Sequence, residues 1–573
     1  MGWRRVPTAP DFVPTPGTCP AAPGPPLRQA STRRRGCGRI GGVVGNFPAA
    51  AGERLRAALG PGATLLGDSG WVADWDCCEA AGQRVTDWTP WLSEERLPQV
   101  RGAFAVAWTD PSGTLRLARD AIGERTVYYA LRPGGLVFAS TIHALLASGL
   151  IERRVNVTAV ARYLTYSYLP GPETLVDEVM ELLAGEMLLY DPHGLQRRRW
   201  WQVPSDMDPR TDEDETRDLL RRTLEGAVRR RLTPGLAIGA FLSGGLDSSL
   251  VVALAKRLHD APVKTWSISF GATYPNELAF SSRVAQHCGT EHRIVELPPR
   301  TVVHHVDDAI ALLSDPIGDP LTVPNAILFR EASAEVGEVL NGEGGDPCFG
   351  GPKNIPMLLA ELLGDGCNAG VADRRASYLR AHQRCYDDLA VMLTPDAAAE
   401  NRLAEELDGA FTDPRYQHFV SRLMALNVTF KGAHHILPKV DAISAAFGVV
   451  PRSPLFDRDV VELACEMSPS LKLRGSVEKY LLKEAVRDLL PAEILARPKS
   501  GMLVPVEGWF SGPLLPEART RLLEGLVPWG LVRRDYLERL LDGKLGGLRP
   551  RRGIKIWLLV TLESWLRGVL RVT

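Results

Sequence analysis

One stretch, 236-LAIGAFLSGGLDSSLVVALAKRL-258, limits what this chain can fold into more than any other. The apolar run Leu236 to Leu242 predicts a buried strand, and leucine at every fourth position from Leu246 to Leu258 predicts a helix packed on a sheet. Glycines in the turn between them let the backbone approach a ligand closely. The unpaired N–H groups at the start of a helix and the helix dipole both favour an anion there. We therefore predict a phosphate-binding turn; a generic glycine turn is the alternative.

Asp247, in the same turn, would repel phosphate unless a divalent cation lay between them. The order S-G-G-L-D-S-S at a strand-to-helix junction resembles the pyrophosphate loop of the ATP pyrophosphatases, which cleave ATP between its α and β phosphates. It differs from the GxxxxGK[ST] loop of other NTPases, because no lysine follows the glycines. The resemblance implies that ATP adenylates a substrate and that pyrophosphate leaves. It also implies nucleotide contacts from Ser243, Gly244, Gly245, Asp247, Ser248 and Ser249.

Composition narrows the class of partner. With 573 residues the chain can form about two to four domains. A net charge of −1 gives no basic field for nucleic acid or for an anionic membrane surface. There is no run of 18 apolar residues that could span a bilayer, and the first residues lack the apolar core of a signal peptide. Nine cysteines without a CxxC pair favour a reduced, cytoplasmic setting.

The chain divides into three parts. Residues 1–36 are rich in Pro, Arg, Ala and Gly without apolar periodicity, which predicts a disordered tail. Residues 37–205 contain strand-like segments and form a first domain. Residues 197–215, with Pro204 and many charged side chains, predict the linker to a second domain at 206–573.

The first domain resembles the class II (N-terminal-nucleophile) glutaminases. Phe104–Trp108 and Leu115–Ala118 flank a turn and predict a hairpin. The resemblance implies a β-rich sandwich. It is carried over about a hundred residues by Gly102–Ala105, Ala118–Asp120, Gly123, Tyr128–Tyr129 and 138-FASTIHALL-146.

Cys37 is the candidate glutaminase nucleophile. Working glutaminases of this class begin with a cysteine whose own α-amino group activates the thiol. Here 36 residues precede Cys37, so its nitrogen is a peptide amide. Only 64 residues separate Cys37 from Gly102, and the glutamine-holding segments R-G-P-D and N-G-E-I-Y-N are absent. We therefore predict a degenerate glutaminase domain in which Cys37 begins a core strand; a catalytic Cys37 would require cleavage after Gly36 or a later start of the chain.

The second domain is predicted to be a doubly wound α/β fold. Strands at residues 263–270, 292–297 and 336–341 are separated by helical crossovers, a spacing typical of a parallel sheet. Ligands of such sheets bind at the carboxyl ends of the strands. Backbone groups at Ile268 and Ser269 are therefore predicted to contact adenine.

A second glycine-rich segment, 342-GEGGDPCFGGPKN-354, follows the last of these strands. Gly344 and Gly345 would again allow close approach to a ligand. Asp346 is predicted to lie opposite Asp247, and two carboxylates together with triphosphate oxygens suit Mg²⁺. A loop-capping role for Asp346 is the alternative.

This segment resembles G-[DE]-G-[GS]-D-E-x-F-G-G-Y of the asparagine synthetases. The resemblance extends over about 500 residues and implies two steps. A carboxylate attacks the α-phosphorus, and a nitrogen nucleophile then displaces AMP. Further matching blocks, in order, are 314-SDPIGDPLTVPN-325, 437-LPKVDAISAAFGVVPRSPLFD-457, 479-KYLLKEAVRDLLP-491 and 496-ARPKSGMLVPVEGWF-510.

Three further residues take roles from the resemblance. Lys499 is implied to lie in a loop where it neutralises the departing phosphates, a solvated lysine being the alternative. Family synthetases carry, at Pro347, a glutamate that helps the nitrogen attack; proline can neither accept a proton nor donate N–H. Glu343 is the candidate to take over part of that role, and Arg452 is either structural or substrate-orienting.

We therefore predict an AMP-forming amide ligase that uses ATP and Mg²⁺ on aspartate or on a specialised small-molecule or peptide carboxylate. The nitrogen donor is ammonia, glutamine or an internal amine, the last as in the related β-lactam synthetases and lasso-peptide cyclases. The alternatives from other classes are a non-catalytic nucleotide-binding relative and an RNA-modifying pyrophosphatase. No nucleic-acid or membrane partner is expected, and a homodimer is compatible with the sequence.

Overall fold

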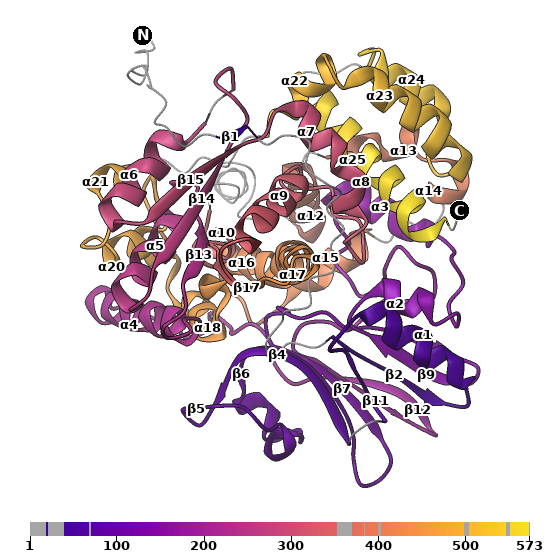
Figure 1. Cartoon of the computed structure of the whole chain (residues 1–573), viewed down its shortest axis with the longest axis horizontal. Helices are drawn as coiled ribbons and strands as arrows, with labels where there is room; N and C mark the ends of the chain where they lie inside the picture. The colour runs from indigo at the N-terminus through magenta and orange to yellow at the C-terminus, as the bar shows by residue number, and fades with distance from the viewer. Residues whose placement is uncertain are drawn as a thin grey trace.

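The computed structural model contains a β-rich N-terminal unit and a larger α/β unit, drawn in indigo to purple and in magenta to yellow in Figure 1. Two candidate site residues, Cys37 and Lys499, lie outside the residues that the structure describes. The described residues are 19–20, 39–67, 70–274, 276–351, 370–382, 384–398, 403–497, 504–545 and 551–571.

Two sheets packed face to face form the N-terminal unit. One has the order β10-β8-β9-β2-β3 and the other β12-β11-β7-β6-β4-β5. Ile40, Leu117 and Phe138 are fully buried members of the apolar layer between them, so the predicted sandwich is confirmed. The predicted hairpin is β6–β7. The strands are β2 (Ile40–Gly45), β3 (Thr64–Leu65), β4 (Trp71–Ala80), β5 (Gln83–Arg84), β6 (Arg101–Thr109), β7 (Leu115–Arg119), β8 (Tyr128–Arg132), β9 (Gly135–Ala139), β10 (Met180–Glu181), β11 (Glu186–Asp191) and β12 (Gly194–Arg199).

A six-stranded parallel sheet forms the centre of the second unit, in the order β1-β15-β14-β13-β16-β17. Helices cover both of its faces, which confirms the doubly wound prediction (Figure 1). One face packs on α4, α5 and α6, and the other on α9 and α17. The strands are β13 (Ile238–Phe241), β14 (Val263–Ser269), β15 (Glu291–Glu296), β16 (Glu338–Leu340), β17 (Val450–Arg452) and β1 (Cys19–Pro20); the helices are α4 (Glu213–Arg230), α5 (Leu246–Leu258), α6 (Leu278–Cys288), α9 (Thr322–Ser333) and α17 (Leu437–Ala446).

The linker prediction for residues 197–215 is wrong at both ends. Arg197–Arg199 complete β12 and pair with β11, and α4 begins at Glu213. β12 lies at the sheet edge, where exposed charged side chains prevent pairing with other chains. The Asp212 side chain caps α4 by accepting from Glu215 N at 2.8 Å. The charges that indicated a linker therefore belong to an edge strand and a helix cap. Inside the predicted tail, Cys19–Pro20 form β1 and pair with β15.

Buried ion pairs join the two units. Arg125 Nε lies 3.2 Å from Asp74 Oδ1, and its Nη1 lies 3.1 Å from Asp441 Oδ1 in the second unit. Arg231 Nη2 reaches back to Glu124 Oε1 at 2.8 Å. Burial raises the pKa of Glu124 to about 7, because Arg231 offsets only part of the lost solvation. Breaking such a pair would leave a buried charge uncompensated, so these contacts fix how the units meet.

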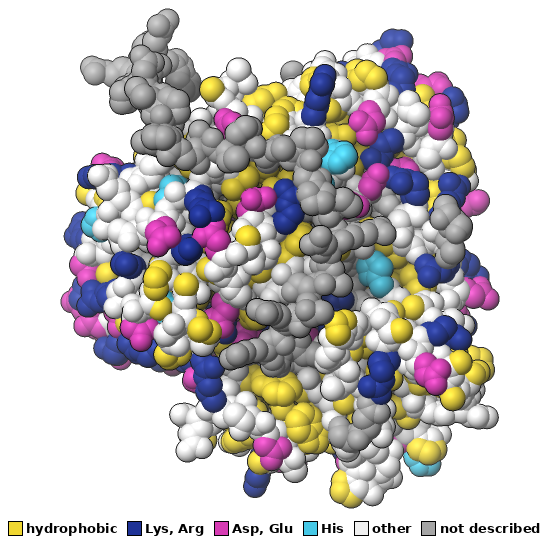
Figure 2. Space-filling view, in the orientation of Figure 1, with side chains coloured by type: hydrophobic (Ala, Val, Ile, Leu, Met, Phe, Trp, Pro, Cys, Tyr) yellow, Lys and Arg dark blue, Asp and Glu magenta, His cyan; other side chains and the backbone are white. Residues whose placement is uncertain are grey.

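None of the described helices has the length and apolarity needed to cross a bilayer. On the face shown in Figure 2, basic and acidic side chains are interspersed over both units. This mixture agrees with the net charge of −1.

Candidate active site

The phosphate-binding turn lies where β13 ends and α5 begins. Gly244 has a φ of +80°, and a Cβ there would lie 2.5 Å from Ser281 N, so only glycine fits. Ser248 Oγ lies 3.0 Å from Ser243 Oγ and accepts from Ser243 N at 3.2 Å. Two hydroxyls therefore meet at the N-terminus of a 13-residue helix, where the backbone N–H groups and the dipole favour an anion.

The loop after β16 packs directly against this turn. A Cβ at Gly345 would lie 2.2 Å from Asp247 Cγ, and one at Gly342 would lie 2.5 Å from Ser248 N. The absence of side chains at both glycines therefore lets the two loops touch, and Asp346 comes to lie beside Asp247.

Lys479 joins these two carboxylates. Its Nζ donates to Asp247 Oδ1 at 2.8 Å and Oδ2 at 2.6 Å, and lies 2.6 Å from Asp346 Oδ1. The Lys479 side chain is 1% exposed. A buried ammonium between two carboxylates offsets their repulsion, and it demonstrates that a cation fits between them. The described residues hold no group of three or more His, Cys, Asp or Glu arranged for a metal ion.

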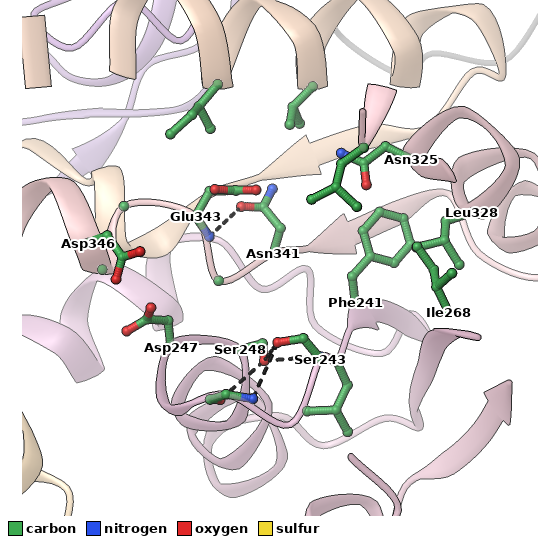
Figure 3. Close-up of a pocket in the computed structure, with 18 of the residues that line it drawn as sticks. Phe241, Ser243, Asp247, Ser248, Ile268, Asn325, Leu328, Asn341, Glu343 and Asp346 are labelled. Carbon is green, nitrogen blue, oxygen red and sulfur yellow. Dashed lines mark hydrogen bonds between the residues drawn. The ribbon is translucent and has the colours of Figure 1, made fainter. Parts of the chain in front are cut away.

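A cavity of about 210 Å³ opens beside these charged groups (Figure 3). Asp247 and Asp346 lie at one end in Figure 3, and Phe241, Ile268 and Leu328 lie at the other. Glu343 stands between the two ends, and its backbone N–H donates to Asn341 Oδ1 at 3.1 Å. One end is therefore charged and the other apolar, a polarity that suits the phosphates and the base of a nucleotide.

Three of the predicted nucleotide-binding residues do not line this cavity. Gly244 forms the turn itself. Ser249 is fully buried and its hydroxyl has no hydrogen-bond partner in the described part of the chain, while the Ser269 hydroxyl accepts from Gly271 N at 3.1 Å. Nucleotide contacts from these three stay predictions. The predicted residues that do line the cavity are Ser243, Gly245, Asp247, Ser248, Ile268, Glu343, Gly344, Gly345 and Asp346.

Sequence reasoning missed Lys479. The residue opens the block 479-KYLLKEAVRDLLP-491, which matched the synthetases as a segment without any residue being given a role. Lys479 stands before α20 (Tyr480–Ala485) with a φ of +53°. Its position next to Asp247 depends on packing between elements 232 residues apart, which no local spacing encodes.

The far wall of the cavity was also missed. It comes from α9 and from the continuous helix formed by the π-helix η5 (Asn427–Ile436) and α17. Lys431 is the one basic side chain among the described residues that line the cavity. Wide π turns occur frequently at functional sites. The wall residues are Leu321, Asn325, Leu328, Phe329, Lys431, Ile436 and Val440.

Arg119 and Asp120 of the glutaminase-like motif face inward, whereas Tyr128 and Thr141 line a small cavity of about 20 Å³. Arg119 is fully buried, and its guanidinium donates to Glu181 and to four backbone carbonyls, one of them Ala433 O of η5. The Asp120 carboxylate accepts from backbone N–H groups at Phe104 and Ile122–Arg125. This motif therefore builds the loop that carries Glu124 and Arg125 across to the second unit.

Arg452 was predicted to be either structural or substrate-orienting, and its contacts are those of a structural residue. Its guanidinium pairs with Asp76 at 3.2 Å and Glu338 at 2.6 Å, and donates to Arg231 O at 2.6 Å. The Arg452 side chain is 4% exposed and does not line the cavity.

A model of the asparagine synthase family matches residues 219–567, more than half of the chain. A glutamine amidotransferase domain model matches residues 87–201. The chain belongs to the asparagine synthase family. It is therefore a carbon–nitrogen ligase of an ATP-dependent amide-forming class.

Relatives agree with this membership. Asparagine synthetase [glutamine-hydrolyzing] 1 of Bacillus subtilis is 24% identical over 82% of this chain and 78% of its own length. A putative glutamine-hydrolysing asparagine synthetase of Mycobacterium tuberculosis is 28% identical over 82% and 77%. Amidase chry2 of Gibberella zeae is 23% identical over 81% and 79%. The proteins that this chain resembles thus carry the names of two activities, asparagine synthetase and amidase.

Proposed function

We propose that the chain activates a substrate carboxylate as an acyl-adenylate, releasing pyrophosphate, and then transfers the acyl group to a nitrogen nucleophile. The observation that carries this proposal is the meeting of Asp247, Asp346 and Lys479 at the charged end of a cavity bounded by two glycine loops. Electrostatic stabilisation of the phosphate charge that develops is the main requirement for such a transfer.

The donor set fits Mg²⁺. Asp247 and Asp346 already converge on a cation, the Lys479 ammonium, and would hold the metal together with phosphate oxygens of the substrate. Bound Mg²⁺ supplies charge neutralisation on the phosphate chain.

The residues on each wall of the cavity then have separate roles in the proposed reaction. The Ser243 and Ser248 hydroxyls and the first N–H groups of α5 bind the leaving pyrophosphate. Lys479 neutralises oxygen charge beside the two carboxylates as the P–O bond breaks, and Lys499 is proposed to do the same. Phe241 and Ile268 pack against the adenine, and Glu343 accepts a proton from the attacking nitrogen.

Ammonia or an amine of the substrate itself is the proposed nitrogen donor. The first unit lacks the glutamine-holding segments R-G-P-D and N-G-E-I-Y-N, which favours a donor other than glutamine. Aspartate and a larger specialised or peptide carboxylate are the two acyl substrates to distinguish. Closure of an amide within one molecule is the second candidate outcome.

The test is pyrophosphate release by the purified full chain with ATP, Mg²⁺, ammonium and aspartate, with asparagine detected by mass spectrometry. We expect release that Asp247→Asn and Asp346→Asn abolish, whereas Asp260→Asn, at a 71% exposed side chain, leaves it unchanged. Release without asparagine, or ATP binding without release, would direct the search to larger carboxylates and to cyclic products that have lost water. ATP binding that survives Asp247→Asn, with no release from any carboxylate, would instead support the non-catalytic alternative.

A further inference from the structure

Lys431 on η5 is a charged side chain of the candidate active site that the protein itself does not neutralise. Its ammonium lines the cavity and is half-buried, and it has no hydrogen bond or ion pair with any residue that the structure describes. The carboxylates of Asp247 and Asp346, in contrast, both pair with Lys479. Partial burial of an unpaired charge costs solvation energy without a compensating contact. A ligand that supplies a negative group would provide that contact.

The charge next to Lys431 on its own helix offers no compensation either. Burial is the main cause that lowers the pKa of His435 to about 4, and the positive charge of Lys431 contributes to this lowering. The His435 imidazole is therefore neutral near pH 7 and repels Lys431 when it is protonated.

Asn341 adds an unused donor to the same cavity. Its side chain is 5% exposed, and its Oδ1 accepts from Glu343 N at 3.1 Å. Asn341 Nδ2 has no hydrogen-bond partner in the described part of the chain. Buried amide groups are almost always hydrogen-bonded, so this N–H group also requires an acceptor that a ligand brings.

The two ends of the nucleotide do not account for these donors. The phosphate end already has the Ser243 and Ser248 hydroxyls and the N-terminus of α5, and Phe241 lies at the apolar end. Asn341 lies between these ends in Figure 3, and Lys431 belongs to the far wall. The donors therefore face the part of the cavity that is left for the second reactant, the acyl substrate.

The carboxylate that attacks the α-phosphorus is a poor partner for Lys431. An ammonium bound to the attacking oxygen would stabilise its charge before the reaction and so weaken it as a nucleophile. A second acidic group, which takes no part in bond formation, can stay paired throughout the reaction.

We propose that Lys431 and Asn341 determine the specificity of the acyl site by binding a second acidic group of the substrate, beside the carboxylate that is activated. This inference rests on the proposed function and restricts its substrate to dicarboxylates. The Lys431 ammonium and the Asn341 Nδ2 group both donate to the second carboxylate, and charge-assisted hydrogen bonds of this kind are the stronger ones in proteins.

The test measures binding in the presence of Mg²⁺ and α,β-methylene-ATP, which cannot release pyrophosphate. Isothermal titration compares three pairs that differ only in one carboxylate: aspartate with β-alanine, glutamate with 4-aminobutyrate, and 2-aminoadipate with 5-aminopentanoate. We expect at least one dicarboxylate to bind ten times more tightly than its partner. No preference in any pair would overturn the proposal. Because this measurement needs no turnover, a preference without pyrophosphate release from ATP itself would support the specificity role and contradict the proposed function.

Lys431→Met should weaken the preferred dicarboxylate about thirtyfold and leave its monocarboxylate partner and the ATP analogue unchanged, because one charge-assisted contact is lost. Lys431→Arg should keep most of the preference. Asn341→Asp retains an oxygen that accepts from Glu343 N but replaces the donor, and should weaken the dicarboxylate about tenfold. Lys256→Met, at an exposed position on α5, is the matched control.

Two results with Lys431→Met would overturn the proposal. Equal weakening of the ATP analogue and the dicarboxylate would show that Lys431 binds phosphate. A lower urea midpoint would show that Lys431 is structural, whereas a side chain without a partner in the described protein should leave the midpoint unchanged or raise it. If this variant fails to fold, Asn341→Asp provides the same comparison from the other donor.

Discussion

The two units of this chain both carry motifs of known families, but they place the motif residues in opposite ways. In the α/β unit, Ser243, Asp247 and Asp346 line a cavity at the ends of parallel strands. In the sandwich, Arg119 and Asp120 are buried and bind the protein itself. The first set is available to a ligand and the second is not.

The difference shows that a motif predicts the backbone fold more reliably than it predicts ligand binding. A matching string indicates that the backbone follows the family fold, because the same turns and buried contacts require the same residues. Whether the side chains bind a substrate depends on what else packs on them. In the sandwich, the motif stabilises the junction with the ligase unit through Glu124 and Arg125.

The sharpest test of this contrast is Lys479→Met. Removing the ammonium between Asp247 and Asp346 should lower pyrophosphate release by about a thousandfold, because charge on the phosphates is no longer offset. Initial rates at saturating ATP measure the effect, and Lys256→Met, at an exposed position near the end of α5, is the control. A rate within threefold of the wild type, roughly 0.7 kcal/mol, would remove Lys479 from the reaction.

Arg119→Met should lower stability and leave the reaction rate unchanged, in contrast to Lys479→Met. Loss of a buried guanidinium that pairs with Glu181 should lower the free energy of unfolding by about 3–5 kcal/mol. The rate per folded molecule should stay near that of the wild type. Urea titration measures the stability, and Arg132→Met, whose partner Glu178 has a 47% exposed side chain, should cost less than about 1 kcal/mol. A large rate loss in folded Arg119→Met protein would contradict the structural role of the motif.

The pH dependence of the free energy of unfolding tests the contact between the two units at Asp315. Burial raises the pKa of this carboxyl from 3.8 to about 8, and the carboxyl accepts from Leu175 N at 2.9 Å. A carboxyl whose pKa is raised on folding holds its proton in the folded state, so the wild-type free energy of unfolding should fall as pH rises from about 4 to about 8.

Asp315→Asn removes this titration while keeping an oxygen that can accept from Leu175 N. Relative to the wild type, the variant should gain on the order of 3 kcal/mol between pH 4.5 and pH 8.5. Urea unfolding at both pH values measures the difference. Parallel pH curves for the two proteins would show that Asp315 titrates normally.

Glycine substitutions give the smallest expected effect. An alanine Cβ at Gly345 would lie 2.2 Å from Asp247, so the loops must separate and ATP affinity should fall about tenfold, roughly 1.4 kcal/mol. At Gly226, in α4, the nearest atom to a Cβ is the end of Arg230 at 3.7 Å. Gly226→Ala should therefore stabilise the fold by about 0.5–1 kcal/mol and leave ATP affinity unchanged. Isothermal titration and urea unfolding measure the two quantities, and equal ATP affinities in both variants would contradict the close contact of the loops.

The sequence by itself determined the local elements of both units. The apolar run before the turn predicted β13, leucines at every fourth position predicted α5, and the strands that follow predicted a parallel sheet. These elements can be predicted from the sequence because strand and helix periodicities depend on residues close together in the chain. The linker prediction was wrong because charged residues mark edge strands and helix caps as well as connections.

The sequence predicted that Asp346 lies opposite Asp247, but only the tertiary structure decided which other side chains meet there. Lys479 reaches Asp247 across 232 residues, and η5 presents Lys431 to the same cavity. The burial of Arg119 against η5 likewise spans 314 residues. Such meetings arise from the packing of distant elements, whose relative placement is set by the whole core and by no local period.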